Sequence, residues 1–191
     1  FGAFRGRSER ELLVWLRQIL VNNLALVHNR FGALNASLQL LNEASDTLHR
    51  LGEVGRRFLP NSIANRVFVL SLLGQYDTAI ELAQEGLTLA RQLDQRVVYA
   101  LIQQNLGLTY YILGHYNRAL RLLDEGQSVR LADGRYHTYV QGELTVTFCL
   151  LQLRRFAEVI ERCQRVRRLC QEHNVTPEAP FSLLNEAKAY A

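Results

Sequence analysis

Apolar residues recur along the chain at spacings of three and four residues, and short polar turns interrupt the pattern at regular intervals. Leu82, Leu89 and Leu93 illustrate this spacing, which brings apolar side chains to one face of a helix. Two helical segments lie between each polar turn and the next turn of similar sequence. The pattern therefore predicts an all-α chain built from helical hairpins.

One turn sequence recurs at fixed intervals. The segment LGQYDTAI at 73–80 returns as LGHYNRAL at 113–120 and as LRRFAEVI at 153–160, and each step is 40 residues. A weaker copy, FGALNASL at 31–38, precedes the first of these by 42 residues. Glycine at such a turn tolerates the positive φ that often ends a helix. Self-similarity at a fixed period predicts a solenoid of stacked hairpins.

Boundary signals agree with this period. Ser8 opens a capping box, Gly52 is placed to end the second helix, and Asp94 is placed to cap the start of the fifth. Pro60 and Pro180 stand where new helices should begin, a position that suits proline. We predict one repeat domain over residues 1–191, with repeats at approximately 8–52, 60–93, 94–133 and 134–174 and a partial repeat at 178–191.

The third unit carries a set of signature residues at a family's spacing, namely Leu106, Gly107, Tyr110, Gly114, Tyr116 and Ala119. This unit resembles a tetratricopeptide repeat, and the resemblance extends over residues 19–191. It is weakest in the fourth unit, where Arg154 stands for glycine and Val159 for alanine. The resemblance implies a right-handed superhelical solenoid of antiparallel helix hairpins, with about four and a half repeats, that binds other proteins and is not an enzyme.

The 40-residue unit is similar to the long-unit repeats of kinesin light chains, of polarity adaptors and of MalT-like or peptide-pheromone-receptor regulators. In those families the first helix of each hairpin lines a concave face. On the first helices of this chain one repeat position holds asparagine, except for Thr145 in the fourth unit. The series is Asn23, Asn65, Asn105 and Asn185. Three residues later, on the same helix face, come Leu26, Phe68, Leu108, Phe148 and Lys188.

This stripe has the chemistry of a peptide-binding surface. An asparagine side chain offers both a donor and an acceptor, so it can bind a partner's main chain whatever the partner's sequence. We expect Gln104 and Tyr111 to add polar and aromatic contacts. The alternative is structural: the amides bond neighbouring helices, and Phe68 and Phe148 belong to the core. The full predicted site is Asn23, Leu26, Asn65, Phe68, Gln104, Asn105, Leu108, Tyr111, Phe148 and Asn185.

The fourth hairpin is rich in arginine, with Glu158 and Glu161 among the basic residues. These carboxylates are spaced to pair with Arg162 and Arg165 at i,i+4, which favours a solvated outer face. The alternative is a patch for an anionic partner. The basic residues are Arg154, Arg155, Arg162, Arg165, Arg167 and Arg168.

Composition excludes several other functions. The net charge of +4 is too small to indicate nucleic acid binding, and no apolar run reaches the length of a membrane span. The five histidines have no metal-ligand spacing, and the three cysteines are expected to be free thiols in a reducing compartment. No catalytic or nucleotide-binding motif is present, so we expect no cofactor and a cytoplasmic location. The absence of methionine suggests a piece of a longer polypeptide.

Two functions remain open from the sequence. The first is an adaptor or sensor module of a larger signalling or regulatory protein, which binds an extended peptide or partner segment in the concave groove. The alternative is a small-molecule-sensing and oligomerisation arm of a MalT-like transcription regulator; a plain spacer is the third reading. Residues 179–191 have the pattern of an opening helix without its partner helix, which predicts a homodimer through exposed terminal helices.

Overall fold

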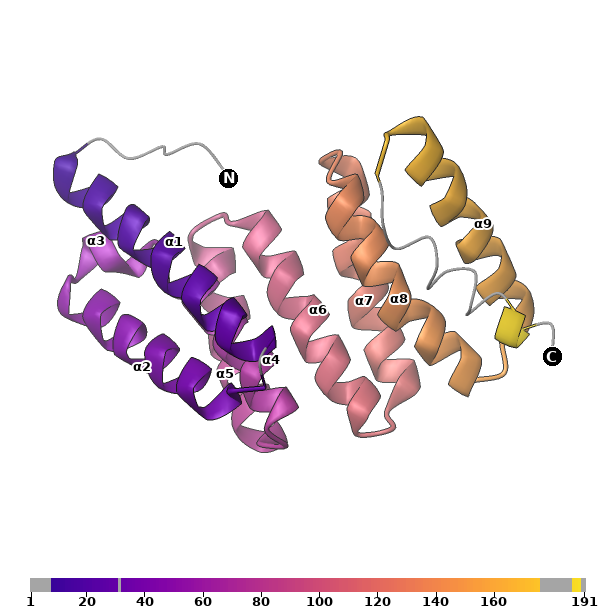
Figure 1. Ribbon diagram of the computed structural model, residues 1–191, viewed down its shortest axis with the longest axis horizontal. Helices are drawn as coiled ribbons and strands as arrows, with labels where there is room; N and C mark the ends of the chain where they lie inside the picture. The colour runs from indigo at the N-terminus through magenta and orange to yellow at the C-terminus, as the bar shows by residue number, and fades with distance from the viewer. Residues whose placement is uncertain (1–7, 31, 176–186, 190–191) are drawn as a thin grey trace. The chain divides into compact units, whose positions relative to one another are not determined.

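The computed structural model describes residues 8–30, 32–175 and 187–189, and every regular element within them is helical. The side chains of residues 26, 27, 29 and 30 lie outside this description. The named helices are α1 (Glu9–Arg30), α2 (Leu34–Arg50), α3 (Glu53–Arg56), α4 (Leu59–Leu72), α5 (Tyr76–Gln92), α6 (Arg96–Ile112), α7 (Tyr116–Ala132), α8 (Tyr136–Gln152) and α9 (Phe156–Glu172) (Figure 1). The predicted all-α fold of consecutive hairpins is confirmed.

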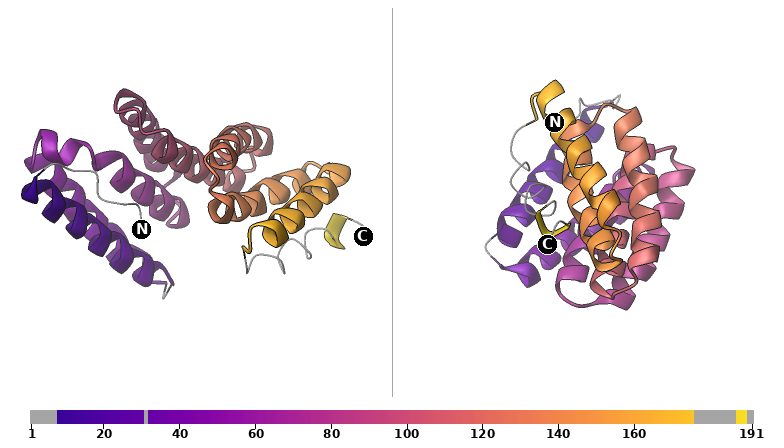
Figure 2. Two further views of the ribbon diagram at one scale, coloured as in Figure 1. Left: turned by 90° about the horizontal axis from the view of Figure 1, so that it is seen from above. Right: turned by 90° about the vertical axis from the view of Figure 1, so that its right-hand side faces the viewer.

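The chain divides into two compact units, Phe1–Ile102 and Gln103–Ala191, and the boundary falls within α6. In unit 1, α1 and α2 form a hairpin, α4 packs against α2, and α4 and α5 form the next hairpin. In unit 2, α8 lies against both α7 and α9, and α8 and α9 form the last described hairpin (Figures 1 and 2). The short α3 lies in the connection between the first two hairpins.

Residues with positive φ divide the helices at an even interval. Among the described residues they are Gly32, Gly52, Gly74, Asp94, Gly114, Gly134, Arg154 and Asn174. Successive members lie 20 residues apart, except for one step of 22 between Gly52 and Gly74. The series alternates between turns within hairpins and turns between hairpins. The positive-φ conformation thus recurs at the same interval even where the residue is not glycine.

The turn after α8 shows how Arg154 adopts this conformation. Arg154 has a φ of 56°, and the next amide, of Arg155, donates to the Leu150 carbonyl at 2.9 Å. The turn after α4 has the same bond, from the Gln75 amide to the Leu70 carbonyl at 2.9 Å. This bond belongs to the common helix ending in which glycine usually takes the positive-φ position. Arg154 therefore fills a glycine position at a conformational cost.

The predicted boundary residues have mixed outcomes. The Ser8 hydroxyl accepts the Glu11 amide at 3.2 Å, which confirms the N-cap half of the predicted capping box, while the Glu11 carboxylate accepts from Arg57 at 3.5 Å. Pro60 lies in the first turn of α4, as predicted. Gly52 follows α2 with a φ of 59°, as predicted. The prediction that Asp94 caps the start of a helix is wrong, because Asp94 has a φ of 52° and ends α5 instead. Pro180 lies outside the described residues.

Small residues bring the helices close together. A Cβ atom on Gly86 of α5 would lie 2.5 Å from Ile63 Cγ2 and 3.0 Å from Ile102 Cδ1, so α4 and the first half of α6 both pack on this glycine. A Cβ atom on Gly107 of α6 would lie 2.8 Å from Leu123 Cγ of α7. Close packing of this kind explains why glycine stands inside the helices despite its cost to helix stability.

Helix α1 differs from the later helices in leaving an apolar stripe exposed. Leu13 is 60% exposed and Leu20 is 69% exposed, and Leu16 and Leu24 are exposed on the same helix. The residue equivalent to Leu20 in the third unit is Ile102, which is fully buried on Gly86. The stripe on α1 thus corresponds to the face that a later hairpin uses for packing.

Candidate peptide-binding surface

The asparagine of the second hairpin bonds a neighbouring helix. The Asn65 Nδ2 group on α4 donates to Asn22 Oδ1 on α1 at 2.9 Å, and Gln18 Nε2 donates to the same oxygen at 2.9 Å. Gln18 is buried, while Asn22 and Asn65 are partly buried. This amide cluster ties α1 to α4. For Asn65 the geometry therefore follows the structural alternative considered from the sequence.

The other predicted residues of unit 1 lie in different surroundings. Asn23 is exposed on α1, next in sequence to the bonded Asn22. Phe68 is partly buried and packs against the apolar cluster of Ala25, Leu41 and Val69. The Leu26 side chain lies outside the description. Among the described predicted residues of this unit, Asn23 is the one that is exposed.

In unit 2 the asparagine of the third hairpin is buried, while Thr145, at the same position of the fourth, is partly exposed. Asn105 is 7% exposed, and its main-chain carbonyl accepts a hydrogen bond from the Thr109 hydroxyl at 3.0 Å. The next residue along the predicted face, Leu108, is partly exposed. Asn185 lies outside the described residues. The structure thus does not bring the asparagines together as an equally exposed row, because the position is exposed in α1, half-buried in α4 and buried in α6.

An aromatic pair joins the first helices of the third and fourth hairpins. The rings of Tyr111 on α6 and Phe148 on α8 stack with centroids 6.2 Å apart and planes at 26°. The Tyr116 ring also lies near Tyr111, with centroids 5.8 Å apart. Both members of the pair are partly exposed. Burial raises the pKa of the Tyr111 hydroxyl, with smaller contributions from Cys149 and Tyr116.

Gln104 extends this surface along α6. Gln104, Leu108 and Tyr111 are spaced at i, i+4 and i+7, so they share one face of the helix. Gln104 is partly exposed, and its amide has no hydrogen-bond partner within the part of the chain that the structure describes. An amide beside a half-exposed leucine and two stacked rings offers hydrogen bonds and apolar contact together. We call Gln104, Leu108, Tyr111 and Phe148 the α6–α8 surface.

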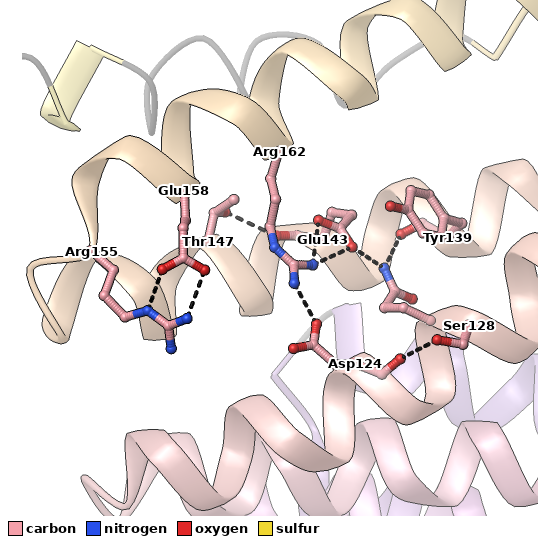
Figure 3. A network of polar contacts seen from close by, with 9 residues as sticks. Asp124, Ser128, Tyr139, Glu143, Thr147, Arg155, Glu158 and Arg162 are labelled. Atoms are coloured by element: carbon pink, nitrogen blue, oxygen red, sulfur yellow. Dashed lines mark hydrogen bonds and ion pairs between the residues drawn. The ribbon is translucent and has the colours of Figure 1, made fainter.

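A second polar constellation in unit 2 was not predicted (Figure 3). Glu143 of α8 is 2% exposed and accepts hydrogen bonds from Arg162 Nη1 of α9, at 3.1 Å and 3.2 Å, and from Gln127 Nε2 of α7, at 2.9 Å. Arg162 Nη2 also binds Asp124 Oδ1 of α7 at 2.6 Å. The guanidinium of Arg162 and the carboxylates of Glu143 and Asp124 therefore join three helices.

Arg162 is held as a cation in this network. Burial alone lowers its pKa, but the charges of Glu143 and Asp124 and their hydrogen bonds outweigh burial, so the pKa is raised overall. The predicted i,i+4 pairing of Arg162 with Glu158 is wrong, because Arg162 reaches across to α7 and α8. Glu158 pairs instead with Arg155, which donates from Nη2 at 2.6 Å.

The network could have been suspected from one feature of the sequence. Glu143 interrupts an apolar helix between Val140 and Val146, where a carboxylate is costly unless a cation reaches it. The partners in this network could not be predicted from the sequence in the same way, because Arg162 and Asp124 lie on other helices. The groups of this network bond one another, so we interpret the network as structural.

The remaining chemistry is sparse. Within residues 8–30, 32–175 and 187–189 no group of three or more metal-ligating side chains comes together, and no helix there is long and apolar enough to cross a membrane. The three cysteines form no disulfide among the described residues, and Cys149 and Cys163 are buried. Burial raises the pKa of the Cys149 thiol to about 12.

These features define an all-helical solenoid of tetratricopeptide-like hairpins with a partly exposed polar and aromatic surface on its first helices. Residues 60–132 match the family model described as tetratricopeptide repeat. No curated protein matches the chain in sequence.

Solved structures share the fold at low identity. The nearly identical TPR-like repeats of a Podosopora anserina protein assigned as a kinesin light chain, in a variant form, match with a TM-score of 0.71 and 15% identity, over 96% of this chain and 88% of that one. The apo form of RapI matches with a TM-score of 0.69 and 14% identity, over 88% of this chain but only 46% of RapI. Both similarities concern the fold.

Proposed function

We propose that this chain is a protein-interaction scaffold that binds an extended peptide or partner segment along its first helices. The observation that carries the proposal is the α6–α8 surface, where the Tyr111 and Phe148 rings stack while partly exposed. Tyrosine and other aromatic residues dominate the binding energy of many protein interfaces. The partly exposed amide of Gln104 adds a donor and an acceptor for a main chain.

The residues proposed to bind the peptide are the aromatic pair and Gln104 and not the row of asparagines. Asn65 bonds Asn22 of the neighbouring α1 and Asn105 is buried in α6, while Asn23 is exposed on α1. A peptide would therefore be held in unit 2 by the rings and Gln104. An adaptor or sensor role in a larger signalling or regulatory protein fits such a module, and the MalT-like arm remains the alternative to it.

The proposed homodimer has one supporting feature, the exposed stripe of Leu13, Leu16, Leu20 and Leu24 on α1. Apolar stripes of this kind are commonly buried by another helix. The other helix named for this contact, in residues 179–191, falls almost entirely outside the described residues. The dimer therefore remains a prediction from the sequence.

The experiment selects peptides from a displayed random library on the immobilised chain and measures their affinity by fluorescence anisotropy. We expect Gln104→Ala combined with Tyr111→Ala to weaken selected peptides about tenfold or more, since loss of a hot-spot aromatic costs about 2 kcal/mol. The matched control is Gln164→Ala with Phe156→Ala, which removes an exposed glutamine and an exposed aromatic from α9 in the same unit. Equal affinities for the two double variants would refute the proposed surface.

A further inference from the structure

The hairpin formed by α6 and α7 carries a pocket beside its turn. The pocket has a volume of about 390 Å³ and is lined by residues 114–118 together with Arg121 and, from the next turn, Leu153. Its cationic side chains, Arg118 and Arg121, both project from the start of α7 and are exposed. The pocket lies at the end of the hairpin and shares none of the four residues of the α6–α8 surface.

The charge at this end of α7 is opposite to that of α5 and α9, the helices equivalent to it in the second and fourth hairpins. Positions 118 and 121 correspond to Thr78 and Glu81 in α5 and to Glu158 and Glu161 in α9. Acidic residues near a helix N-terminus are favourable, because the helix dipole is positive there, and arginine is unfavourable for the same reason. The third hairpin alone among these three places two cations at this end. A bound anion would offset the unfavourable interaction of these arginines with the helix dipole.

The first of these arginines is held in place by an aromatic ring. The Arg118 guanidinium carbon lies 4.1 Å from the centre of the Tyr110 ring, and Tyr110 is 3% exposed. Stacking on a buried ring leaves the in-plane N–H groups of the guanidinium free to bind both oxygens of a planar acid. Within the described residues neither Arg118 nor Arg121 forms an ion pair.

The backbone adds donors of the same kind. Among the described residues no side chain caps the N-terminus of α7, where the cap residue is His115. The Arg118 amide already donates to the His115 carbonyl at 3.0 Å, so the first-turn amides that remain to favour an anion are those of Tyr116 and Asn117. Two guanidinium groups, the uncapped amides and a pocket of sufficient size thus converge on one place.

We propose that this pocket binds an oxyanion carried by an acidic or phosphorylated segment of a partner protein. The oxygens contact Arg118 and Arg121 and approach the first amides of α7, while Tyr116 and Leu153 contact the neighbouring part of the segment. The site is distinct from the α6–α8 surface, so one partner could occupy both or different partners could use each.

The test uses the full chain labelled with ¹⁵N and three probes of equal length: a peptide with three glutamates, the same peptide with one phosphoserine, and one with three lysines. Inorganic phosphate is the fourth probe. We expect the glutamate or the phosphoserine peptide to shift the backbone amides of residues 116–118, and the lysine peptide to leave them unchanged. The stronger of the first two identifies the oxyanion.

The decisive variant is Arg118→Thr with Arg121→Glu, which installs the residues that α5 already carries at these positions. It should bind the acidic peptide at least about tenfold more weakly, because hydrogen bonds to two charged groups are lost. The matched control, Arg135→Thr with Arg168→Glu, makes the same change of charge at two arginines of unit 2 outside the pocket and should bind normally. Arg121→Glu alone, which leaves the stacked Arg118 in place, serves if the double variant does not fold.

Three results would overturn the proposal. The first is the absence of shifts at residues 116–118 with either acidic peptide. The second is equal loss of affinity in the variant and its control, which would indicate general charge attraction. The third is binding of inorganic phosphate as tightly as of either acidic peptide, which would indicate an ion site to which the rest of the segment contributes nothing.

Discussion

Units 1 and 2 fill one repeat position in opposite ways. The position is Ile63 in α4 but Gln103 in α6 and Glu143 in α8. Ile63 packs on Gly86 of the next helix, whereas Gln103 donates to Glu125 at 2.5 Å and Glu143 binds Arg162. The same hairpin geometry thus accepts either apolar packing or a charged network. The comparison teaches that the helix spacing is set by the repeat and that the contacts within it can be exchanged.

The largest expected effect comes from breaking the network in unit 2. Glu143→Ile should lower the free energy of unfolding by about 3 kcal/mol, because Arg162 loses the more buried of its two carboxylate partners. Urea denaturation followed by circular dichroism measures the change. Glu158→Gln is the control in the same unit. Its exposed pair with Arg155 should contribute less than about 1 kcal/mol.

A second substitution tests whether an apolar contact can replace the charged network. Position 162 corresponds to Leu122 and Leu82 in the preceding hairpins, so Glu143→Ile with Arg162→Leu gives this hairpin the two apolar residue types that unit 1 carries at these positions, Ile63 and Leu82. We expect the double variant to recover most of the lost stability, since well-packed apolar residues can replace a buried ion pair. If the double variant is as unstable as the sum of the two single variants, the two kinds of contact are not interchangeable.

The fold could be predicted from the sequence because its information is periodic. The spacing of apolar residues and of the turns determines the helices, and it does so even at Arg154, where the residue type argues against the turn. The error at Asp94 has a simple cause. Aspartate favours the start of a helix but also tolerates positive φ, and the repeat register decides between the two.

The candidate site was harder to predict, because periodicity gives the face of a helix but not the depth of each residue. Asn23, Asn65 and Asn105 share one position and differ in exposure, since the helices beside them differ. The partner of Asn65 is Asn22, one residue away from the predicted row. The sequence also predicts Gln104 and Tyr111 as site residues; both are partly exposed, and the Tyr111 ring stacks on Phe148.

A smaller effect is expected from the amide cluster of unit 1. Asn65→Ala should lower the free energy of unfolding by about 1 kcal/mol, the value of one neutral hydrogen bond. The cost is limited because Asn22 Oδ1 still accepts from Gln18. Asn23→Ala is the matched control on α1, where an exposed asparagine should change stability by less than about 0.5 kcal/mol. Equal effects of the two variants would remove the distinction between a bonded and an accessible asparagine.

The smallest effect concerns the turns that both units share. Arg154→Gly should raise the free energy of unfolding by somewhat less than about 1 kcal/mol, because glycine adopts positive φ without the strain that arginine incurs but loses more entropy on folding. Gly74→Arg at the equivalent turn of unit 1 should have the opposite sign and a similar size, because the two turns have the same hydrogen bond. Thermal unfolding of both variants measures the pair. A loss of stability in Arg154→Gly would show that the exposed arginine makes a contact that outweighs its backbone strain, and the two units would then differ in their turns as well as in their cores.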